Sequence, residues 1–268
     1  MRLRRERITL RRGGLMIALL GLLAAGPWSA APARADADAL WNKVVQVCVK
    51  SDPATDPANP CDVVNHAADY VMVKDICGPT QYLLLPIRRL SGIESDALAP
   101  TPGNHAANYF AAAWQNRSHV AARAGRDLAP EDYALALNSI DRRSQNQFHI
   151  HIDLARPDLR AALLPYQHDP VGAWSLFRYQ GHDYHLTRLT DLTHQNPIEI
   201  VRARVSAAKG VMRHQSIGLV GATFDDKTTG FYLLNSEFNG TADGSGWAEE
   251  LEIDHPRSDC QYRRSPAP

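Results

Sequence analysis

The stretch Gln147-Phe148-His149-Ile150-His151-Ile152-Asp153 decides the fold of this chain of 268 residues. Polar and apolar residues alternate along it, and a period of two is typical of a half-buried β-strand. In such a strand the phenylalanine and the two isoleucines point into a core, whereas Gln147, His149 and His151 share the opposite face. The pattern therefore predicts a strand over 147–154 that holds two imidazole rings side by side on a rigid support.

Two histidines on one strand face are compatible with three kinds of site. A neutral imidazole such as that of His149 can attack phosphorus and carry a nucleotidyl group, while His151 supplies a proton to the leaving oxygen. Histidine suits both tasks because its ordinary pKa, about 6.5, lies close to working pH. A His-x-His pair also forms one edge of many zinc or copper sites, and both residues could be ordinary polar residues of a strand. The motif alone leaves all three open.

Strand and helix patterns continue on both sides of this stretch. The residues after 234 are rich in Gly, Ser and Asp and are expected to be irregular, and no internal sequence repeat is found. Hairpins are predicted over 70–87 and 217–234, a strand over 133–139, a strand pair around Gly181 over 179–189, and helices over 38–50, 104–123, 198–208 and from Pro157 onward.

The N-terminus carries the pattern of a secretory signal. Arginines crowd residues 2–12 against a single acid, Glu6, and residues 15–26 form an unbroken apolar run. Ala33-Arg34-Ala35 follows as a small-x-small cleavage pattern. The run is shorter than the roughly 20 residues of a membrane-spanning helix. Residues 1–35 are therefore predicted to be a signal peptide, with a membrane anchor as the alternative. We expect a protein of the periplasm, or one anchored in the inner membrane and facing the periplasm.

The overall composition limits the classes of partner. Apolar residues make up 44% of the chain, which is enough to build a full core. The 29 basic residues are balanced by 29 acidic ones. A broad electrostatic grip on nucleic acid would need a basic excess, so nucleic-acid binding is not expected. A small basic pocket for a phosphorylated substrate remains compatible with this balance.

Four cysteines lie in the part of the chain that is expected to be exported. An even number in an oxidising compartment suggests disulfides, and four cysteines allow three connectivities. Cys48 and Cys61 flank a loop with three prolines, so a local bridge between them is favoured, which leaves Cys77 to pair with Cys260. Free buried thiols are the alternative.

Several motifs of the chain resemble those of one family. The stretch from Gln147 to Ile152 resembles the histidine-triad signature, in which three histidines alternate with apolar residues, although Gln147 stands where the first histidine is expected. Further motifs are similar to those of one branch, the CDP-diacylglycerol pyrophosphatases, over residues 40–262: the segments 70–75 and 78–86, Gly92-Ile93-Glu94-Ser95, Ala113-Trp114-Gln115, Asn138-Ser139, Gln145-Asn146, Arg156-Pro157-Asp158 and Gly181-His182-Asp183-Tyr184.

The resemblance implies a fold and a set of site residues. The expected fold is an α+β domain over 36–268, with a HIT-like antiparallel sheet, helices packed mainly on one of its sides, and a C-terminal extension. The middle histidine of the triad is the nucleophile and falls on His149, and the third, which assists the phosphate and the leaving group, falls on His151. The positions expected to bind substrate are Asn138, Lys74, Ser144, Gln145 and Gln147. No metal or other cofactor is implied.

The reaction implied is hydrolysis of CDP-diacylglycerol to CMP and phosphatidate through a covalent cytidylyl-histidine, near a membrane surface. A nucleotidyl hydrolase or transferase of broader specificity is the first alternative. A non-catalytic nucleotide- or lipid-binding module is another, suggested by Gln147 in place of a histidine, and a metal-binding His-x-His protein is a third. The sequence indicates no particular oligomeric state.

Overall fold

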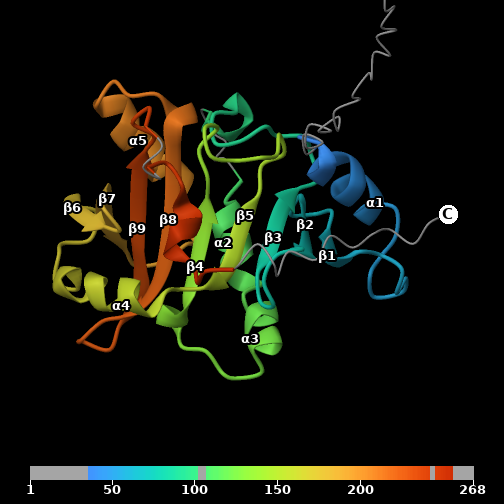
Figure 1. Cartoon of the computed structure of the whole chain (residues 1–268), viewed down its shortest axis with the longest axis horizontal. Coiled ribbons are helices and arrows are strands. Elements are labelled where there is room, and N and C mark those ends of the chain that lie inside the picture. The colour runs from blue at the N-terminus through green and yellow to red at the C-terminus, as the bar shows by residue number, and fades with distance from the viewer. Residues whose placement is uncertain (1–35, 102–106, 242–244, 256–268) are drawn as a thin grey trace, which may run out of the picture. The chain divides into compact units, whose positions relative to one another are not determined.

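The computed structural model describes residues 36–101, 107–241 and 245–255, all within the unit Ala35–Pro268. These residues form one nine-stranded sheet in which every neighbouring pair is antiparallel, with the order β1-β2-β3-β5-β4-β8-β9-β7-β6 (Figure 1). The strands are β1 Cys61–Asn65, β2 Tyr70–Lys74, β3 Tyr82–Pro86, β4 Tyr133–Leu137, β5 Ile150–Leu154, β6 Ser175–Tyr179, β7 His182–Leu189, β8 Gln215–Thr223 and β9 Thr229–Glu237.

Short helices accompany the sheet, in keeping with the predicted α+β class. The α-helices are α1 Gln46–Cys48, α2 Tyr109–Gln115, α3 Ser118–Ala124, α4 Pro157–Leu163 and α5 Pro197–Ala207. A π-helical segment, η1 Leu40–Val45, leads into α1, and short 3-10 turns lie at η2 Asp96–Leu98, η3 Pro130–Asp132, η4 Leu164–Tyr166, η5 Met212–His214 and η6 Ala248–Leu251. None of the helices in the described ranges is long and apolar enough to span a membrane, and the predicted signal over 1–35 lies outside those ranges.

The sheet repeats one connectivity in its two halves, although the sequence shows no repeat. The first half has the order β2-β3-β5-β4 and the second, read from the other edge, has β6-β7-β9-β8. In each half a hairpin is followed by one or two helices and then by two more strands. The later of these two strands lies in the sheet between the hairpin and the earlier strand. The halves meet where β4 pairs with β8, for example Leu135 with Leu219. The predicted C-terminal extension is therefore a continuation of the same sheet.

Both predicted hairpins are confirmed. Tyr70 pairs with Pro86 in the β2–β3 hairpin, and Thr223 pairs with Thr229 in the β8–β9 hairpin. The strand pair around Gly181 forms β6 and β7, and the helix predicted over 198–208 forms α5. Alternating β-branched or aromatic residues and turn residues were sufficient for these elements because the contacts are local.

The long helix predicted over 104–123 is wrong. Two seven-residue helices, α2 and α3, take its place, and residues 104–106 lie outside the described ranges. Asn116 ends α2: its side chain donates to the Ala112 carbonyl at 2.8 Å and to the Tyr70 hydroxyl at 3.1 Å. Asparagine competes in this way with the helical backbone pattern, and the apolar periodicity of the segment did not reveal it.

The strand predicted over 147–154 begins three residues later, at Ile150. The Phe148 amide donates to the carbonyl of Leu90, which belongs to no strand, so regular pairing with β3 starts only at Ile150. The predicted alternation nevertheless holds, because the side chains of Phe148 and Ile150 lie fully buried in the core and His149 points away from it.

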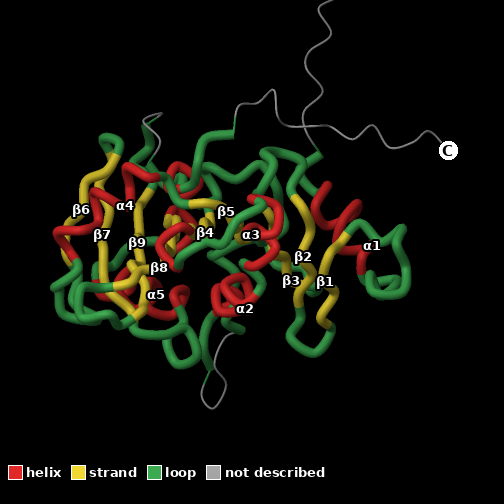
Figure 2. Tube along the Cα trace, turned by 90° about the horizontal axis from the view of Figure 1, so that it is seen from below, coloured by secondary structure: helices red, strands yellow, loops and turns green. Residues whose placement is uncertain are grey.

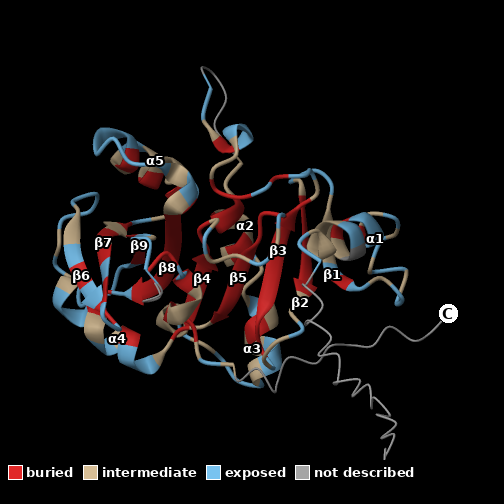
Figure 3. Cartoon of the chain, turned by 45° about the horizontal axis from the view of Figure 1, so that its top comes forward, coloured by how far each residue is buried: buried red, intermediate tan, exposed pale blue. Residues whose placement is uncertain are grey.

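The two faces of the sheet are covered differently. The first face carries the largest apolar cluster, which joins Leu84, Leu135, Ile150 and Leu219 to residues of α2, α3 and α5. The second face carries two separate clusters, one under α1 and one under α4. Most of the helical residues pack on the first face, as expected, because α2, α3 and α5 contribute to its cluster. Of the described α-helices only α1 and α4 cover the second face, and Figure 2 shows α4 on the opposite side of the sheet from α2 and α5. Figure 3 shows that the central strands are the buried ones.

A row of polar residues separates the two clusters of the second face. The cluster under α1 uses β2 and β3, and the cluster under α4 begins at Ala134 of β4. Between them β5 presents His151 and Asp153, with His149 just before the strand. Leu83 of β3 and Ala136 of β4 pair with His151 from either side. The fold therefore places the predicted histidines in a polar gap at the centre of the sheet.

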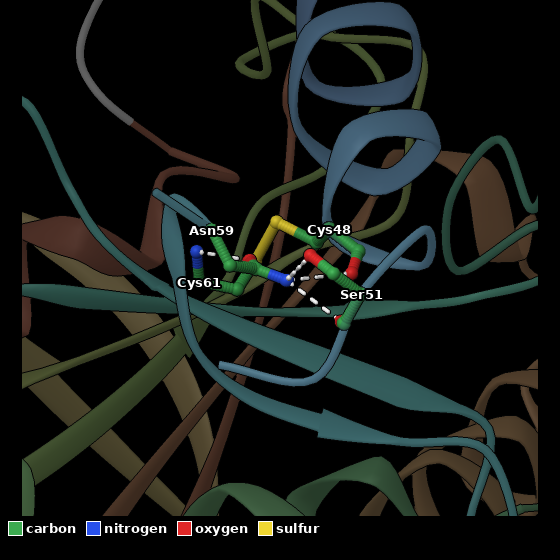
Figure 4. The surroundings of a disulfide bond; sticks show 4 residues. All are labelled: Cys48, Ser51, Asn59 and Cys61. Carbon is green, nitrogen blue, oxygen red and sulfur yellow. Dashed lines mark hydrogen bonds between the residues drawn. A yellow bond between two sulfur atoms is a disulfide. The ribbon is translucent and has the colours of Figure 1, made fainter. Parts of the chain in front are cut away.

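The predicted bridge between Cys48 and Cys61 is confirmed, and it ties α1 to β1 (Figure 4). Asn59 reinforces the loop between them: its amide donates to the carbonyls of Cys48 and Ser51 at 2.9 and 2.8 Å, and its oxygen accepts from the Cys61 amide. Cys77 is also disulfide-bonded. Its predicted partner Cys260 lies outside the described residues, so that pairing stays a prediction.

Replacing both Cys48 and Cys61 by serine should lower the free energy of unfolding by about 3 kcal/mol, because the bridge closes a loop with a sequence separation of 13 and restricts the unfolded chain. Urea unfolding of the double variant beside the wild type measures this. An unchanged free energy of unfolding would show instead that the Asn59 hydrogen bonds alone hold the loop.

Candidate active site

His149 and His151 form a compact pair in the polar gap of the second face. Their ring centroids lie 5.0 Å apart, and the residues are only 7% and 6% exposed. The pairing of β5 with β3 and β4 fixes the backbone beneath them. Two buried imidazoles this close cannot both be charged without a large cost in free energy, so at most one of the two rings should be protonated to the cation at a time.

The proton of His149 is placed by a backbone carbonyl. His149 Nδ1 lies 2.7 Å from the carbonyl oxygen of Gln147. A carbonyl only accepts, so the neutral ring carries its proton on Nδ1 and leaves the lone pair of Nε2 free. No described residue bonds to Nε2. This arrangement leaves Nε2 with the unprotonated lone pair that a nitrogen nucleophile needs.

Burial keeps His149 uncharged. Loss of solvation, followed by the charge of His151, lowers the pKa of His149 to about 4, and the hydrogen bond to Gln147 opposes this only partly. At neutral pH the ring is therefore neutral and competent to attack.

His151 stands beside a carboxylate. Its Nε2 lies 3.3 Å from a carboxylate oxygen of Glu249, in an alignment that makes no hydrogen bond. Its Nδ1 is buried and bonds to no described residue. Burial would raise the pKa of Glu249, but the charge of His151 and a hydrogen bond from Asn138 outweigh it and hold that pKa below its ordinary value.

Asn138 ties Glu249 to the end of β4, and its predicted contact with the nucleotide stays a prediction. Its amide nitrogen donates to the Glu249 carboxylate, and its oxygen accepts from the Ala248 amide at 2.8 Å. No sequence pattern singled out Glu249, because it is 111 residues from Asn138 and lies in a stretch expected to be irregular. Its one sequence signal is an acidic run between apolar residues, Trp247-Ala248-Glu249-Glu250-Leu251-Glu252.

Gln147, which is predicted to stand in the place of a first triad histidine, has a fully buried side chain. The side-chain nitrogen donates to the carbonyls of Pro86 and Arg88 at 3.0 and 3.1 Å. These hydrogen bonds hold the segment that leads into β5 against the end of β3. Since the Gln147 carbonyl orients His149, the side chain acts on the pair by fixing that carbonyl.

The other predicted substrate contacts lie apart from the pair or already have partners. The Lys74 ammonium donates to the carbonyls of Asp75 and Gly78 at 2.7 and 2.8 Å. Gln145 accepts from the Leu40 amide at 3.0 Å and so holds the start of η1, and Ser144 is exposed. Their roles in binding stay predictions.

Arg143 is a cation whose charge affects His149 of the pair. Its guanidinium makes two bonds to the Glu94 carboxylate, at 2.9 and 2.6 Å, and the side chain is 5% exposed. Its positive charge is one of the influences that lower the pKa of His149. Arg143 Nε is buried and bonds to no described residue.

Metal ligation, one of the alternatives, would need further ligands. Among the described residues no three His, Cys, Asp or Glu side chains are arranged to hold a metal ion. A pair in which one imidazole is neutral and the other lies next to the Glu249 carboxylate suits proton transfer and nucleophilic attack.

Comparison with known proteins identifies the family. The family model described as CDP-diacylglycerol pyrophosphatase matches residues 35–262. This chain belongs to the CDP-diacylglycerol pyrophosphatase family. A curated CDP-diacylglycerol pyrophosphatase of Yersinia pestis is 34% identical over 226 residues, which cover 82% of this chain and 84% of that protein. The matched region of this pyrophosphatase family member contains the histidine pair, Arg143 and Glu249.

His149 should titrate near pH 4 rather than near 6.5 in NMR spectra of the histidine rings. Because the pKa of His149 is lower in the folded protein, the unfolded chain binds this proton first as the pH falls below about 6.5. The contribution of His149 should therefore lower the free energy of unfolding as the pH falls from about 6.5 to about 4. The same protein unfolded in urea serves as the reference. A midpoint near 6.5 in the folded protein would contradict the burial argument.

Proposed function

We propose that this enzyme hydrolyses CDP-diacylglycerol to CMP and phosphatidate at the His149–His151 pair, through a cytidylyl-histidine intermediate. Membership of the CDP-diacylglycerol pyrophosphatase family supports the substrate. The observation that carries the mechanism is the 2.7 Å contact of His149 Nδ1 with the Gln147 carbonyl, which leaves Nε2 as an unprotonated nucleophile.

In the first step Nε2 of His149 attacks the phosphorus of the cytidylyl group. A P–N bond forms and the bond from that phosphorus to the bridging oxygen breaks. The electron pair leaves on the phosphatidate oxygen, which takes a proton from His151. His149 keeps its Nδ1 proton and is now a positively charged cytidylyl-imidazolium, stabilised by the Gln147 carbonyl.

In the second step water attacks the same phosphorus and the P–N bond breaks. The hydroxyl group stays on CMP, and the second proton of the water returns to His151. His149 is released as the neutral imidazole with which the cycle began. One histidine therefore exchanges bonds to phosphorus while the other exchanges protons.

The phosphoryl oxygens need positive donors during both steps. Arg143 is the candidate in the described structure, because its charge reaches His149 and its Nε is without a bond there. The Ser139 hydroxyl, buried after β4 and likewise without a described partner, is a candidate neutral donor. The mechanism assigns no step to a metal ion.

The location of the reaction is part of the proposal. A lipid substrate has to be reached at a membrane surface, and export directed by residues 1–35 would bring the enzyme to the periplasmic side of the inner membrane. Truncation of those residues with fractionation of the cells would test this, since retention of the truncated chain in the cytoplasm is expected.

The full-length protein in detergent should release CMP from CDP-diacylglycerol in the presence of a chelator, and His149→Ala should release it up to ~10⁶-fold more slowly, because the variant lacks the nucleophile. CMP release is followed by chromatography. His185→Ala is the matched control, since that histidine lies on β7, away from the pair, and full activity is expected.

Four outcomes would contradict this proposal. Equal rates of CMP release by His149→Ala and by wild type would show that His149 is not the nucleophile. Loss of wild-type activity with the chelator would favour a metal site. Binding of CDP-diacylglycerol without release of CMP would favour the binding-module alternative, and faster cleavage of soluble nucleotides would favour the hydrolase of broader specificity.

A further inference from the structure

Trp247 presents an aromatic ring to solvent: its side chain is 41% exposed. It lies just before η6, which packs over β4 and β8 (Figure 1). The other described tryptophans, Trp41, Trp114 and Trp174, are half-buried, and each holds an arginine guanidinium over its ring. Within the described ranges the Trp247 ring has no aromatic ring or guanidinium stacked on it, so its faces are open to another partner.

The backbone on both sides of Trp247 is bound to the end of β4. The Ser139 amide donates to the Gly246 carbonyl at 3.2 Å, and the Ala248 amide donates to the Asn138 side chain at 2.8 Å. Gly246 has a φ of +75°, and a β-carbon there would come within 2.9 Å of the Ser139 hydroxyl oxygen. Glycine suits both constraints. The position of Trp247 is therefore determined by the fold.

The indole of Trp247 reaches the histidine pair through Glu249. Burial raises the pKa of Glu249, whereas hydrogen bonds from Asn138 and from the Trp247 side chain are among the influences that lower it. The indole N–H is the only donor of that side chain. The same carboxylate has an oxygen 3.3 Å from His151 Nε2. One carboxylate thus joins the polar edge of the indole to the pair, and the remainder of the ring system is apolar.

A second exposed apolar side chain is held by the same loop after β4. The Ile140 amide donates to the Arg213 carbonyl at 2.9 Å, which attaches η5 to this loop. Val211, just before η5, is 50% exposed, and the Arg213 side chain is exposed as well. Two exposed apolar residues and one cation, Trp247, Val211 and Arg213, are therefore carried by segments bound to residues 138–140. They are here called the site rim.

The chemistry of the site rim suits the surface of a lipid layer. Tryptophan is favoured where one end of its side chain meets an apolar medium and the other a polar one, and it is enriched at the level of lipid headgroups. An exposed arginine such as Arg213 can bind the phosphate of a headgroup. The proposed substrate has a diacylglycerol half that must stay in the bilayer or lie against apolar side chains.

The proposed mechanism indicates which half of the substrate lies at the site rim. In that mechanism the phosphatidate oxygen leaves beside His151, while the nucleotide half becomes bonded to His149. Trp247 joins the site at His151, through Glu249. The ring of Trp247 is therefore next to the half of the substrate that carries the acyl chains.

We propose that Trp247 contacts the diacylglycerol half of the substrate and, with Val211 and Arg213, gives the site its preference for a lipid over a soluble nucleotide diphosphate. This rests on the proposed function for the reaction, whereas contact of Trp247 with lipid does not require turnover. Trp247 exchanges no proton and forms no bond to phosphorus; its role is to determine specificity.

The first test compares CMP release from two substrates. CDP-diacylglycerol in detergent micelles carries acyl chains, and CDP-glycerol has the same pyrophosphate without them. Trp247→Ala should lower kcat/KM for the lipid about tenfold or more, because an apolar contact of a large aromatic side chain is lost. The value for CDP-glycerol should stay as in wild type. Trp247→Phe keeps an apolar ring and should restore most of the preference for the lipid.

The second test is tryptophan fluorescence, which needs no turnover. The full-length protein is mixed with phosphatidylcholine vesicles whose acyl chains carry bromine, which quenches the indoles that reach them. The quenching should be smaller in Trp247→Phe than in wild type. Trp174→Phe is the matched control, because Trp174 packs against the cluster of the first face, away from the pair, and its replacement should leave the quenching by lipid unchanged.

Each result of these tests distinguishes the proposal from an alternative. Equal losses for the two substrates, with weaker inhibition by CMP, would overturn it and show that Trp247 stacks on the base. Equal losses with unchanged inhibition by CMP would reduce Trp247 to a support of Glu249. Quenching that is the same in Trp247→Phe and wild type would overturn the contact with lipid. Absence of CMP release by wild type from either substrate would reject the proposed function alone, and the quenching would still decide whether Trp247 contacts lipid.

Discussion

The alternation along β5 is the constraint on which the rest of the structure depends. Its apolar side chains complete the core of the first face, so a shift of register by one residue would put imidazoles into that core and is excluded by its cost. The same alternation forces His149, His151 and Asp153 onto the second face, where the sheet on either side is apolar. Buried polar groups are stabilised by partners, and neighbouring segments supply them for His149 and for Asp153.

The partners also determine the chemistry of the pair. The Gln147 carbonyl sets the tautomer of His149, and burial keeps that ring neutral with a pKa of about 4. A carboxylate from a distant part of the chain lies beside the other ring. A symmetrical motif of two histidines thereby becomes an asymmetrical pair, with one ring suited to bond to phosphorus and the other suited to move a proton. The hydrolysis proposed for this member of the CDP-diacylglycerol pyrophosphatase family uses both rings.

Local signals in the sequence were sufficient for the hairpins β2–β3 and β8–β9, for helix α5, for the Cys48–Cys61 bridge and for the direction of the histidines. The break between α2 and α3 was missed because it depends on Asn116 reaching Tyr70 across the fold. Glu249 was missed because its contacts join residues far apart in a stretch without periodicity, and the repeated connectivity of the two halves leaves no sequence repeat to detect. The triad positions were predicted by resemblance and stay a prediction, whereas the structural partners of Lys74 and Gln145 became visible only once the loops were placed.

The proposed mechanism requires that His149 becomes covalently bonded to the nucleotide. The most direct measurement is rapid quenching of the full-length enzyme into base during turnover of CDP-diacylglycerol, followed by mass spectrometry of its peptides, since phosphorus–nitrogen bonds to histidine survive base. The proposed mechanism predicts a cytidylyl group on the peptide that contains residues 147–154. The group should be located at His149 and should be absent from His149→Ala. Turnover at full rate with no adduct at any quench time, or an adduct on a different residue, would contradict it.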